Sequence, residues 1–275
     1  MFKAKRSNST LGSTFSLLEL VFHLTARRIR GSSGNAIVGL LSNMTQAIMM
    51  VAIFYLLMNI MGMRRAAVRG DFILYLMSGV FLFMTYNKTM SAVSGSGGPT
   101  SAMMKHAPMT TAVAILSSAL SVLYNQVLTM VIVLYLYHAA ITPIEIENWV
   151  GTLSMLMLAW FVGIGIGLMF LAATPWAPGL VGIIRLVYTR ANVIASGKMF
   201  LANTLPPKML AMFSWNPLFH LIDQSRGFTF INYNPHFTDW HYPLYVGLAL
   251  MMLGLLGEFY TRQHASASWG KGGVL

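Results

Sequence analysis

The chain has 275 residues, of which 56% are hydrophobic and only 9% are charged. Soluble domains carry roughly 25% charged residues, so this composition excludes a fully water-exposed surface and favours a protein whose outside contacts lipid. The formal net charge is +11. In a membrane protein this excess is typical of basic segments that face anionic headgroups on the cytoplasmic side, and we expect no nucleic-acid partner. The absence of cysteine excludes a disulfide, a thiolate metal site and a cysteine nucleophile.

The first apolar stretch, residues 15–24, is short and runs directly into Arg27, Arg28 and Arg30. A secretory signal would end in a small-residue cleavage site, so we expect no cleavable signal peptide. The apolar residues recur at helical spacing, which predicts that residues 1–35 form a cytoplasmic helix lying in the headgroup plane. An ordinary amphipathic packing helix is the alternative.

An all-α integral membrane protein with six transmembrane helices is predicted, because a crossing needs about 20 mostly apolar residues. Six stretches meet this condition: 37–63, 72–92, 107–138, 149–173, 179–202 and 242–260. Spans one to five then fall in residues 36–202, and residues 242–275 hold the sixth span and a tail. Basic residues favour the side of the two termini and the loop acids favour the other, which predicts cytoplasmic termini. The basic cluster Arg64, Arg65 and Arg69 runs against this trend.

Two segments are neither spans nor simple loops. In residues 94–108 glycines end the second span, and Pro99 can open a short cytoplasmic helix that docks a soluble partner. A plain polar loop is the alternative.

The second segment, residues 203–241, contains two short helix signals. Pro206 and Pro207 can start one helix, and Asn216 and Pro217 can cap and start another that ends at Gly227. About 10 residues reach only about 15 Å, too short for a hydrocarbon core of about 30 Å. These features predict a re-entrant hairpin on the outer side, which should border a pathway.

Sequence motifs give little sign of an enzyme or of metal binding. No phosphate-binding G-x-x-x-x-G-K-[ST] motif occurs, so ATP-driven work would need a separate ATPase. H-E-x-x-H and G-x-S-x-G are also absent. We expect His220 to be a structural hydrogen-bonding residue. Gly163 and Gly167 form a G-x-x-x-G face that predicts close helix packing.

Charged residues within the fifth span are the first candidates for function. Arg185 can reach the inner interface and Lys198 the outer one. Arg190 lies near the middle, where it should face a partner or an aqueous path that attracts an anion. A structural ion pair is the alternative.

Aromatic side chains are the second group of candidates, because their faces stack on sugar rings. Core packing or lipid contact is the alternative for each of them. The candidates are Tyr75, Phe81, Phe83, Tyr86, Tyr135, Tyr137, Trp160 and Tyr188.

Four stretches together resemble one known family. They are the basic start at 17–30, the segment 102–108, the glycine triplet at 163–167, and Ser196-Gly197 followed by Leu205-Pro206 and Trp215-Asn216-Pro217-Leu218 with a downstream Arg226. The whole chain resembles the permease subunits of ABC-2-type transporters that export polysaccharide in the capsule, O-antigen and teichoic-acid pathways. The capsule branch is nearest.

The resemblance implies a homodimer in the bacterial inner membrane with two ATP-binding subunits, which carry the ATP and magnesium. This chain would hold no cofactor, and a periplasmic adaptor and an outer-membrane channel would receive the polysaccharide. It further implies an outer gate at Trp215, Asn216, Pro217, His220 and Arg226. A coupling helix would contact the ATPase through Pro99, Met103, Met104, Lys105 and His106.

Two other functions stay open at this point. An exporter of the same class could carry a drug or a lipid, although the long Trp-Asn-Pro-Leu hairpin favours a polysaccharide. A membrane-embedded glycan-modifying enzyme would need acids or a Ser/His pair converging within a span, and the sequence offers none that is apparent.

Overall fold

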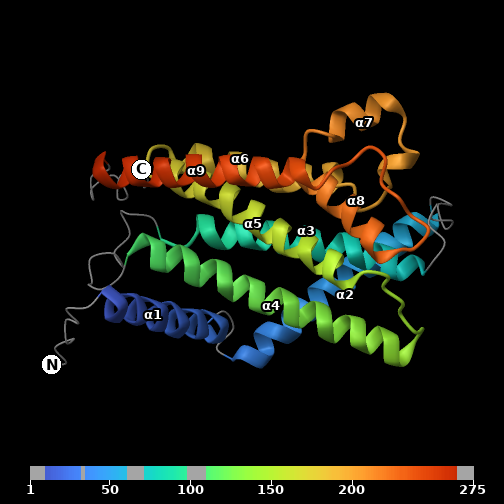
Figure 1. Cartoon of the computed structure of the whole chain (residues 1–275), viewed down its shortest axis with the longest axis horizontal. Coiled ribbons are helices and arrows are strands. Elements are labelled where there is room, and N and C mark those ends of the chain that lie inside the picture. The colour runs from blue at the N-terminus through green and yellow to red at the C-terminus, as the bar shows by residue number, and fades with distance from the viewer. Residues whose placement is uncertain (1–9, 32–34, 61–70, 98–109, 265–275) are drawn as a thin grey trace.

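The computed structural model describes residues 10–31, 35–60, 71–97 and 110–264, and these residues form an all-helical fold (Figure 1). The elements are α1 (Thr10–Gly31), α2 (Ala36–Ile60), α3 (Phe72–Ser94), α4 (Thr111–Ala140), α5 (Trp149–Ala173), α6 (Pro178–Ala195), the 3-10 turn η2 (Ala202–Thr204), α7 (Pro207–Phe213), α8 (Pro217–Thr229) and α9 (His241–His264).

The long helices from α2 to α6, together with α9, run along the bundle in alternating directions (Figure 1). The start of α1 and the end of α9 lie at one end of the bundle, and α7 and α8 lie at the other. The two short helices are therefore grouped far from both ends of the described chain.

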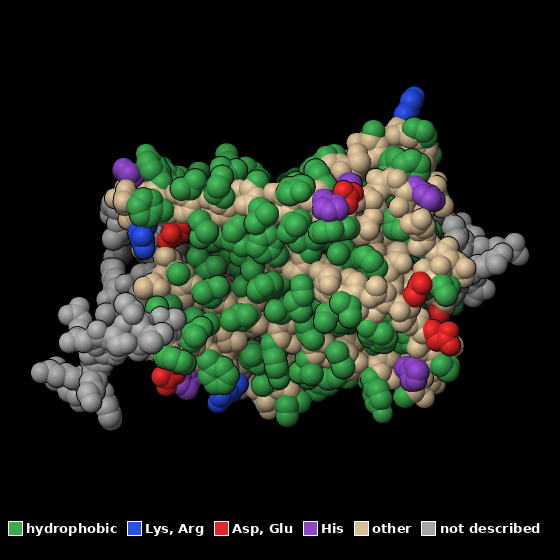
Figure 2. All heavy atoms as spheres, viewed as in Figure 1, with side chains coloured by type: hydrophobic (Ala, Val, Ile, Leu, Met, Phe, Trp, Pro, Cys, Tyr) green, Lys and Arg blue, Asp and Glu red, His purple; other side chains and the backbone are tan. Residues whose placement is uncertain are grey.

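Four helices, α2, α4, α5 and α9, are long and apolar enough to cross a membrane, which indicates a membrane protein. Hydrophobic side chains form a broad band across the face drawn in Figure 2, and most charged side chains lie toward its two ends. This distribution is what a bilayer requires, with apolar groups at the depth of the hydrocarbon and charges near the headgroups.

The centre of the bundle is α3, which is buried along most of its length and packs against α4, α5 and α8. Close packing against α5 depends on small residues. A Cβ added at Gly163 would lie 2.8 Å from the carbonyl oxygen of Tyr86, and one at Gly167 would lie 2.7 Å from Cβ of Val93. The predicted glycine packing face is confirmed, and its partner is α3.

All six stretches predicted as spans contain a long helix, and the fourth has the predicted limits. The helix of the fifth predicted span, α6, ends at Ala195, seven residues earlier than the predicted end at residue 202. Ser196 caps it, and Gly197 follows with a φ of +73°, a left-handed conformation that favours glycine and turns the chain back into the bundle.

The two short helices predicted in residues 203–241 are confirmed, with one corrected end. Pro207 opens α7, and Asn216 caps α8 by accepting a hydrogen bond from the Leu218 N–H. Gly227 does not end α8, which continues to Thr229. A Cβ at Gly227 would lie 2.7 Å from the Pro235 ring, so glycine at this position lets the following loop pack closely.

The N-terminal helix α1 packs alongside α4. Val21 is buried, while Phe15, Leu18 and Phe22 are exposed. Nη2 of Arg28 donates to the carbonyl oxygen of Ser96, 3.2 Å away, just beyond the end of α3. One side of α1 is thus a packing surface, and its placement in a headgroup plane stays a prediction.

Candidate functional site

The α6–α8 unit, made of α6, the connection 196–206, α7 and α8, carries many of the predicted functional residues. Arg226 is its anchor, with a relative exposure of 0%. Its Nη1 donates to the carbonyl oxygens of Gly197 and Phe200 at 2.9 and 2.8 Å, and its Nη2 to that of Lys198 at 2.6 Å. Arg226 on α8 therefore fixes the chain where it leaves α6.

Two residues of α3 lie against the guanidinium of Arg226. The guanidinium carbon of Arg226 lies 4.0 Å from the centre of the Tyr75 ring, a cation–π contact. One turn along, Gly79 leaves the room that Arg226 needs, because an added Cβ would lie 3.0 Å from Nη2. Arg226 is thus enclosed by protein, which makes it a structural residue in this conformation and not a group that meets a substrate.

Asp223, one turn before Arg226, ties the hairpin to the loop that leads into α9. Its carboxylate accepts hydrogen bonds from the hydroxyls of Tyr233 and Thr238 at 2.6 and 2.8 Å, and from the Ala202 N–H at 3.2 Å. Burial and the nearby carboxylate raise the pKa of Tyr233 above its ordinary value, so its hydroxyl keeps the proton that it donates.

Asn216 links α8 to α6. Its side-chain amide donates to Oδ1 of Asn192 at 2.9 Å and to the Ala195 carbonyl at 3.1 Å, while its own oxygen caps α8. Pro217, at the first position of α8, is buried. Trp215, in contrast, is exposed at the surface.

His220 makes two bonds to backbone. The Asp239 N–H donates to its Nδ1 at 3.1 Å, so the proton sits on Nε2, which donates to the Ser214 carbonyl at 2.7 Å. The expectation that His220 is a structural hydrogen-bonding residue is confirmed.

The position of Lys198 near the end of the predicted fifth span suggested that it reaches the outer interface. The structure shows instead that Lys198 is buried. Its relative exposure is 1%, and Nζ lies 3.4 Å from the centre of the Phe83 ring and 4.6 Å from that of Phe54. Nζ has no hydrogen-bond partner in the described part of the chain. The reason is the turn at Gly197, which directs this part of the chain inward toward α3.

Helix α6 has two different faces. On the inner face Arg185 donates to Oγ of Ser94 at 2.9 Å, and the hydroxyls of Tyr188 and Tyr86 lie 2.5 Å apart. The outer face is apolar and exposed, with Ile183, Val187 and Ile194 between 60% and 67% exposed.

Arg190 lies on the exposed side of α6, as expected for a residue that faces a partner or an aqueous path. Within the described ranges, no Lys or Arg forms an ion pair with an Asp or Glu; the ion pairs found there both involve histidine. The alternative role of Arg190 in an ion pair therefore gains no support from a described acid.

The other aromatic candidates do not form one surface. Tyr75, Phe81, Phe83, Tyr86 and Tyr137 are buried in the core, and Tyr135 is exposed on α4. Trp160 donates from Nε1 to the Ala119 carbonyl at 2.8 Å, which joins α5 to α4. The candidates Pro99, Met103, Met104, Lys105 and His106 lie outside the described residues, as do Arg64, Arg65 and Arg69.

Sequence reasoning missed several residues that build the unit. Phe54 and Gly79 belong to this group because no motif marks a single aromatic residue or glycine on a helix. Asp223 and Tyr233 were missed because their contact depends on how the loop before α9 folds back.

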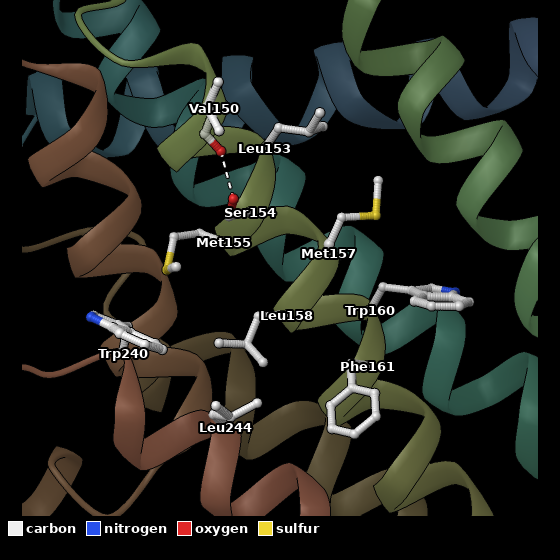
Figure 3. Close-up of a pocket in the computed structure, with 10 residues that line it drawn as sticks. All are labelled: Val150, Leu153, Ser154, Met155, Met157, Leu158, Trp160, Phe161, Trp240 and Leu244. Carbon is white, nitrogen blue, oxygen red and sulfur yellow. Dashed lines mark hydrogen bonds between the residues drawn. The ribbon is translucent and has the colours of Figure 1, made fainter.

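A groove of about 610 Å³ runs between α5 and the start of α9 (Figure 3). Its walls are apolar and include Leu153, Leu158 and Leu244. The hydroxyl of Ser154 donates a hydrogen bond to the carbonyl oxygen of Val150 at 2.7 Å. No charged group lines it, so it suits an acyl chain better than an ionic ligand.

Among the residues that the structure describes, no three His, Asp or Glu side chains come together as metal ligands. No family model matches the chain, and no curated protein matches it.

Proposed function

We propose that the chain is the permease subunit of an ATP-driven exporter that moves an anionic, lipid-anchored polysaccharide of the capsule type across the bacterial inner membrane. The observation that carries this proposal is the two-faced α6. Its inner face is bonded to α3, and its outer face is apolar, exposed and carries Arg190. An apolar helix face with a charge in the middle of a membrane requires a partner or a wet path.

The exposed face of α6 supports a homodimer. A second copy packed against Ile183, Val187 and Ile194 would bury these side chains and bring two Arg190 residues to the seam between the subunits. Such a seam would attract an anionic polymer, because guanidinium groups bind carboxylate and phosphate in a bidentate way.

The alternating directions of the long helices support six membrane crossings with both termini on one side, and the basic residues near the termini favour the cytoplasmic side. Helix α3 has polar residues along its length. Neighbouring helices bury most of them, so these polar groups would not be exposed to lipid if α3 crosses the membrane. Helix α6 has 18 residues and reaches about 27 Å, which approaches the thickness of the hydrocarbon core.

The α7–α8 hairpin supports an outlet on the far side. Helices α7 and α8 have 7 and 13 residues, too short to cross, and they lie at the end of the bundle opposite α1's start. Asn216 holds this hairpin to α6, and Arg226 and Asp223 hold it to the connection that follows α6, so a movement of α6 would be transmitted to it. This linkage suits a gate that opens when α6 moves.

The energy would come from two separate ATP-binding subunits, since the sequence holds no phosphate-binding loop. They would contact the cytoplasmic segment around Lys105 and His106, and a periplasmic adaptor and an outer-membrane channel would take the polymer onward.

Deleting the gene and measuring polysaccharide inside the cell and on its surface tests this function. The expected result is polymer that accumulates inside and disappears from the surface. Loss of polymer in both places would favour an enzyme of glycan synthesis or modification. An unchanged profile would favour an exporter of a drug or a lipid.

A further inference from the structure

A second cavity, of about 540 Å³, lies between α1, α2, α3 and α4, away from the hairpin. Unlike the groove in Figure 3, it has polar walls. Each of the four helices contributes to them, and the polar lining side chains include Arg28, Asn43, Asn87, Lys88 and Gln126.

Two of these side chains are cations with only neutral partners. Nζ of Lys88 donates to Oδ1 of Asn43 at 2.6 Å, and Arg28 donates to the Ser96 carbonyl. None of the seven acids of the chain, all of which the structure describes, lines this cavity. Positive charge held in a membrane protein without an acid is costly, so a ligand with negative charge would be favoured.

Two further side chains on the cavity wall have acceptor oxygens that receive no hydrogen bond from a described residue. Asn87 and Gln126 are 7% and 2% exposed, and among the described residues Oδ1 of Asn87 and Oε1 of Gln126 find no hydrogen-bond partner. The amide of Asn87 already donates to the Phe83 carbonyl at 3.0 Å, which fixes its oxygen as the free group. Unpaired buried acceptors favour a ligand that also carries hydroxyl donors.

The surroundings of the cavity are apolar. Leu41 on α2, and Leu120 and Tyr124 on α4, are exposed and lie within two residues of cavity-lining positions. A polar cavity beside exposed apolar side chains suits a ligand with a charged head and acyl chains.

We propose that this cavity binds the headgroup of a membrane lipid that carries both a phosphate and free hydroxyls, of which phosphatidylglycerol is the simplest example. Lys88 and Arg28 contact the phosphate, and the oxygens of Asn87 and Gln126 accept from the hydroxyls. The site lies outside the α6–α8 unit, so the inference goes beyond the proposed export function and does not rest on it.

Native mass spectrometry of the purified full chain tests this site, with phosphatidylglycerol, phosphatidic acid and phosphatidylethanolamine of equal acyl chains added in turn. Phosphatidylglycerol should bind best, because phosphatidic acid lacks the hydroxyls and phosphatidylethanolamine lacks net charge. Lys88→Met should weaken phosphatidylglycerol binding about tenfold, the effect of one lost charge-assisted hydrogen bond. Gln126→Leu should remove the preference for phosphatidylglycerol over phosphatidic acid.

Lys208→Met is the matched control, since it removes the same charge from an exposed residue on α7. It should leave binding unchanged. Equal retention of the three lipids by the wild-type chain would overturn the proposal even if a variant fails to fold. Equal losses for Lys88→Met and Lys208→Met would also overturn it. Water-soluble glycerol phosphate that displaces the lipid at equal concentration would show a site for a free anion and contradict the lipid assignment.

Discussion

The guanidinium of Arg226 lies over the ring of Tyr75 with 4.0 Å between its central carbon and the ring centre, while its nitrogens bind three backbone carbonyls beyond α6. One side chain thus joins α8, α3 and the connection that follows α6. The arginine of the hairpin motif therefore holds the fold together, whereas the side chain of Arg190 on α6 is exposed.

Arg226→Met should lower the free energy of unfolding by about 3 kcal/mol or more, because several buried carbonyls lose their donors. Arg226→Lys should recover little of this, since an ammonium lacks the planar fork that reaches the carbonyls of Gly197, Lys198 and Phe200. Thermal unfolding of the purified protein in detergent measures both effects. A wild-type midpoint for either variant would contradict the anchoring role.

Gly79→Ala tests the same anchor from α3. The new methyl would lie 3.0 Å from both Nη2 of Arg226 and Cβ of Lys198, so about 1–3 kcal/mol of stability should be lost through overpacking. Gly182→Ala is the control, because a Cβ at that position meets nothing within 4 Å and alanine favours a helix. Similar unfolding midpoints for the two variants would argue against a tight contact at Gly79.

Lys198→Met should behave in the opposite way to Arg226→Met. In the described part of the chain the ammonium has aromatic rings beside it but no hydrogen-bond partner, and methionine fills a similar volume without a buried charge. We expect an unfolding midpoint equal to that of the wild type or higher. A large decrease would show that the ammonium forms a stabilising contact of its own.

The proposed dimer can be tested by crosslinking, since the chain has no native cysteine. Val187→Cys places one thiol on the exposed face of α6, and an oxidant should produce a disulfide-linked dimer in membranes. Val131→Cys, on the exposed side of α4, is the control and should stay monomeric. Crosslinking at Val131 but not at Val187 would place the interface elsewhere.

Arg190→Ala should reduce export strongly while leaving unfolding and ATPase association at wild-type levels, because the residue is exposed and lacks a described ion-pair partner. Lys208→Ala, an equal charge change on α7, should leave export intact. Substitutions at Lys105 and His106 should instead weaken co-purification of the ATPase. If Arg190→Ala and the Lys105 variants lose the ATPase equally, this division of roles is wrong.

Much of the fold was predictable from sequence, because local signals coincide with the elements they produce. Asn216 and Pro217 start α8 as their capping preferences require, and Gly163 and Gly167 allow the close approach of α5 to α3. The six long apolar stretches each gave a helix.

The errors arose where tertiary contacts decide the outcome. Gly197 turns Lys198 into the core instead of continuing a span toward the interface. Gly227 lies within α8 because its missing side chain makes room for Pro235. The contacts of Asp223 with Tyr233 and Thr238 join residues whose separation along the chain has no periodic signal, so sequence patterns could not reveal them.

The most direct test of the export function is transport by the purified chain, reconstituted with its ATP-binding subunit in inside-out vesicles that carry lipid-linked polysaccharide. Added ATP should move polymer into the lumen, where an external glycosidase cannot digest it, and Arg190→Ala should reduce the protected fraction. ATP hydrolysis without any protected polymer, from vesicles that hold a correctly assembled complex, would contradict the account.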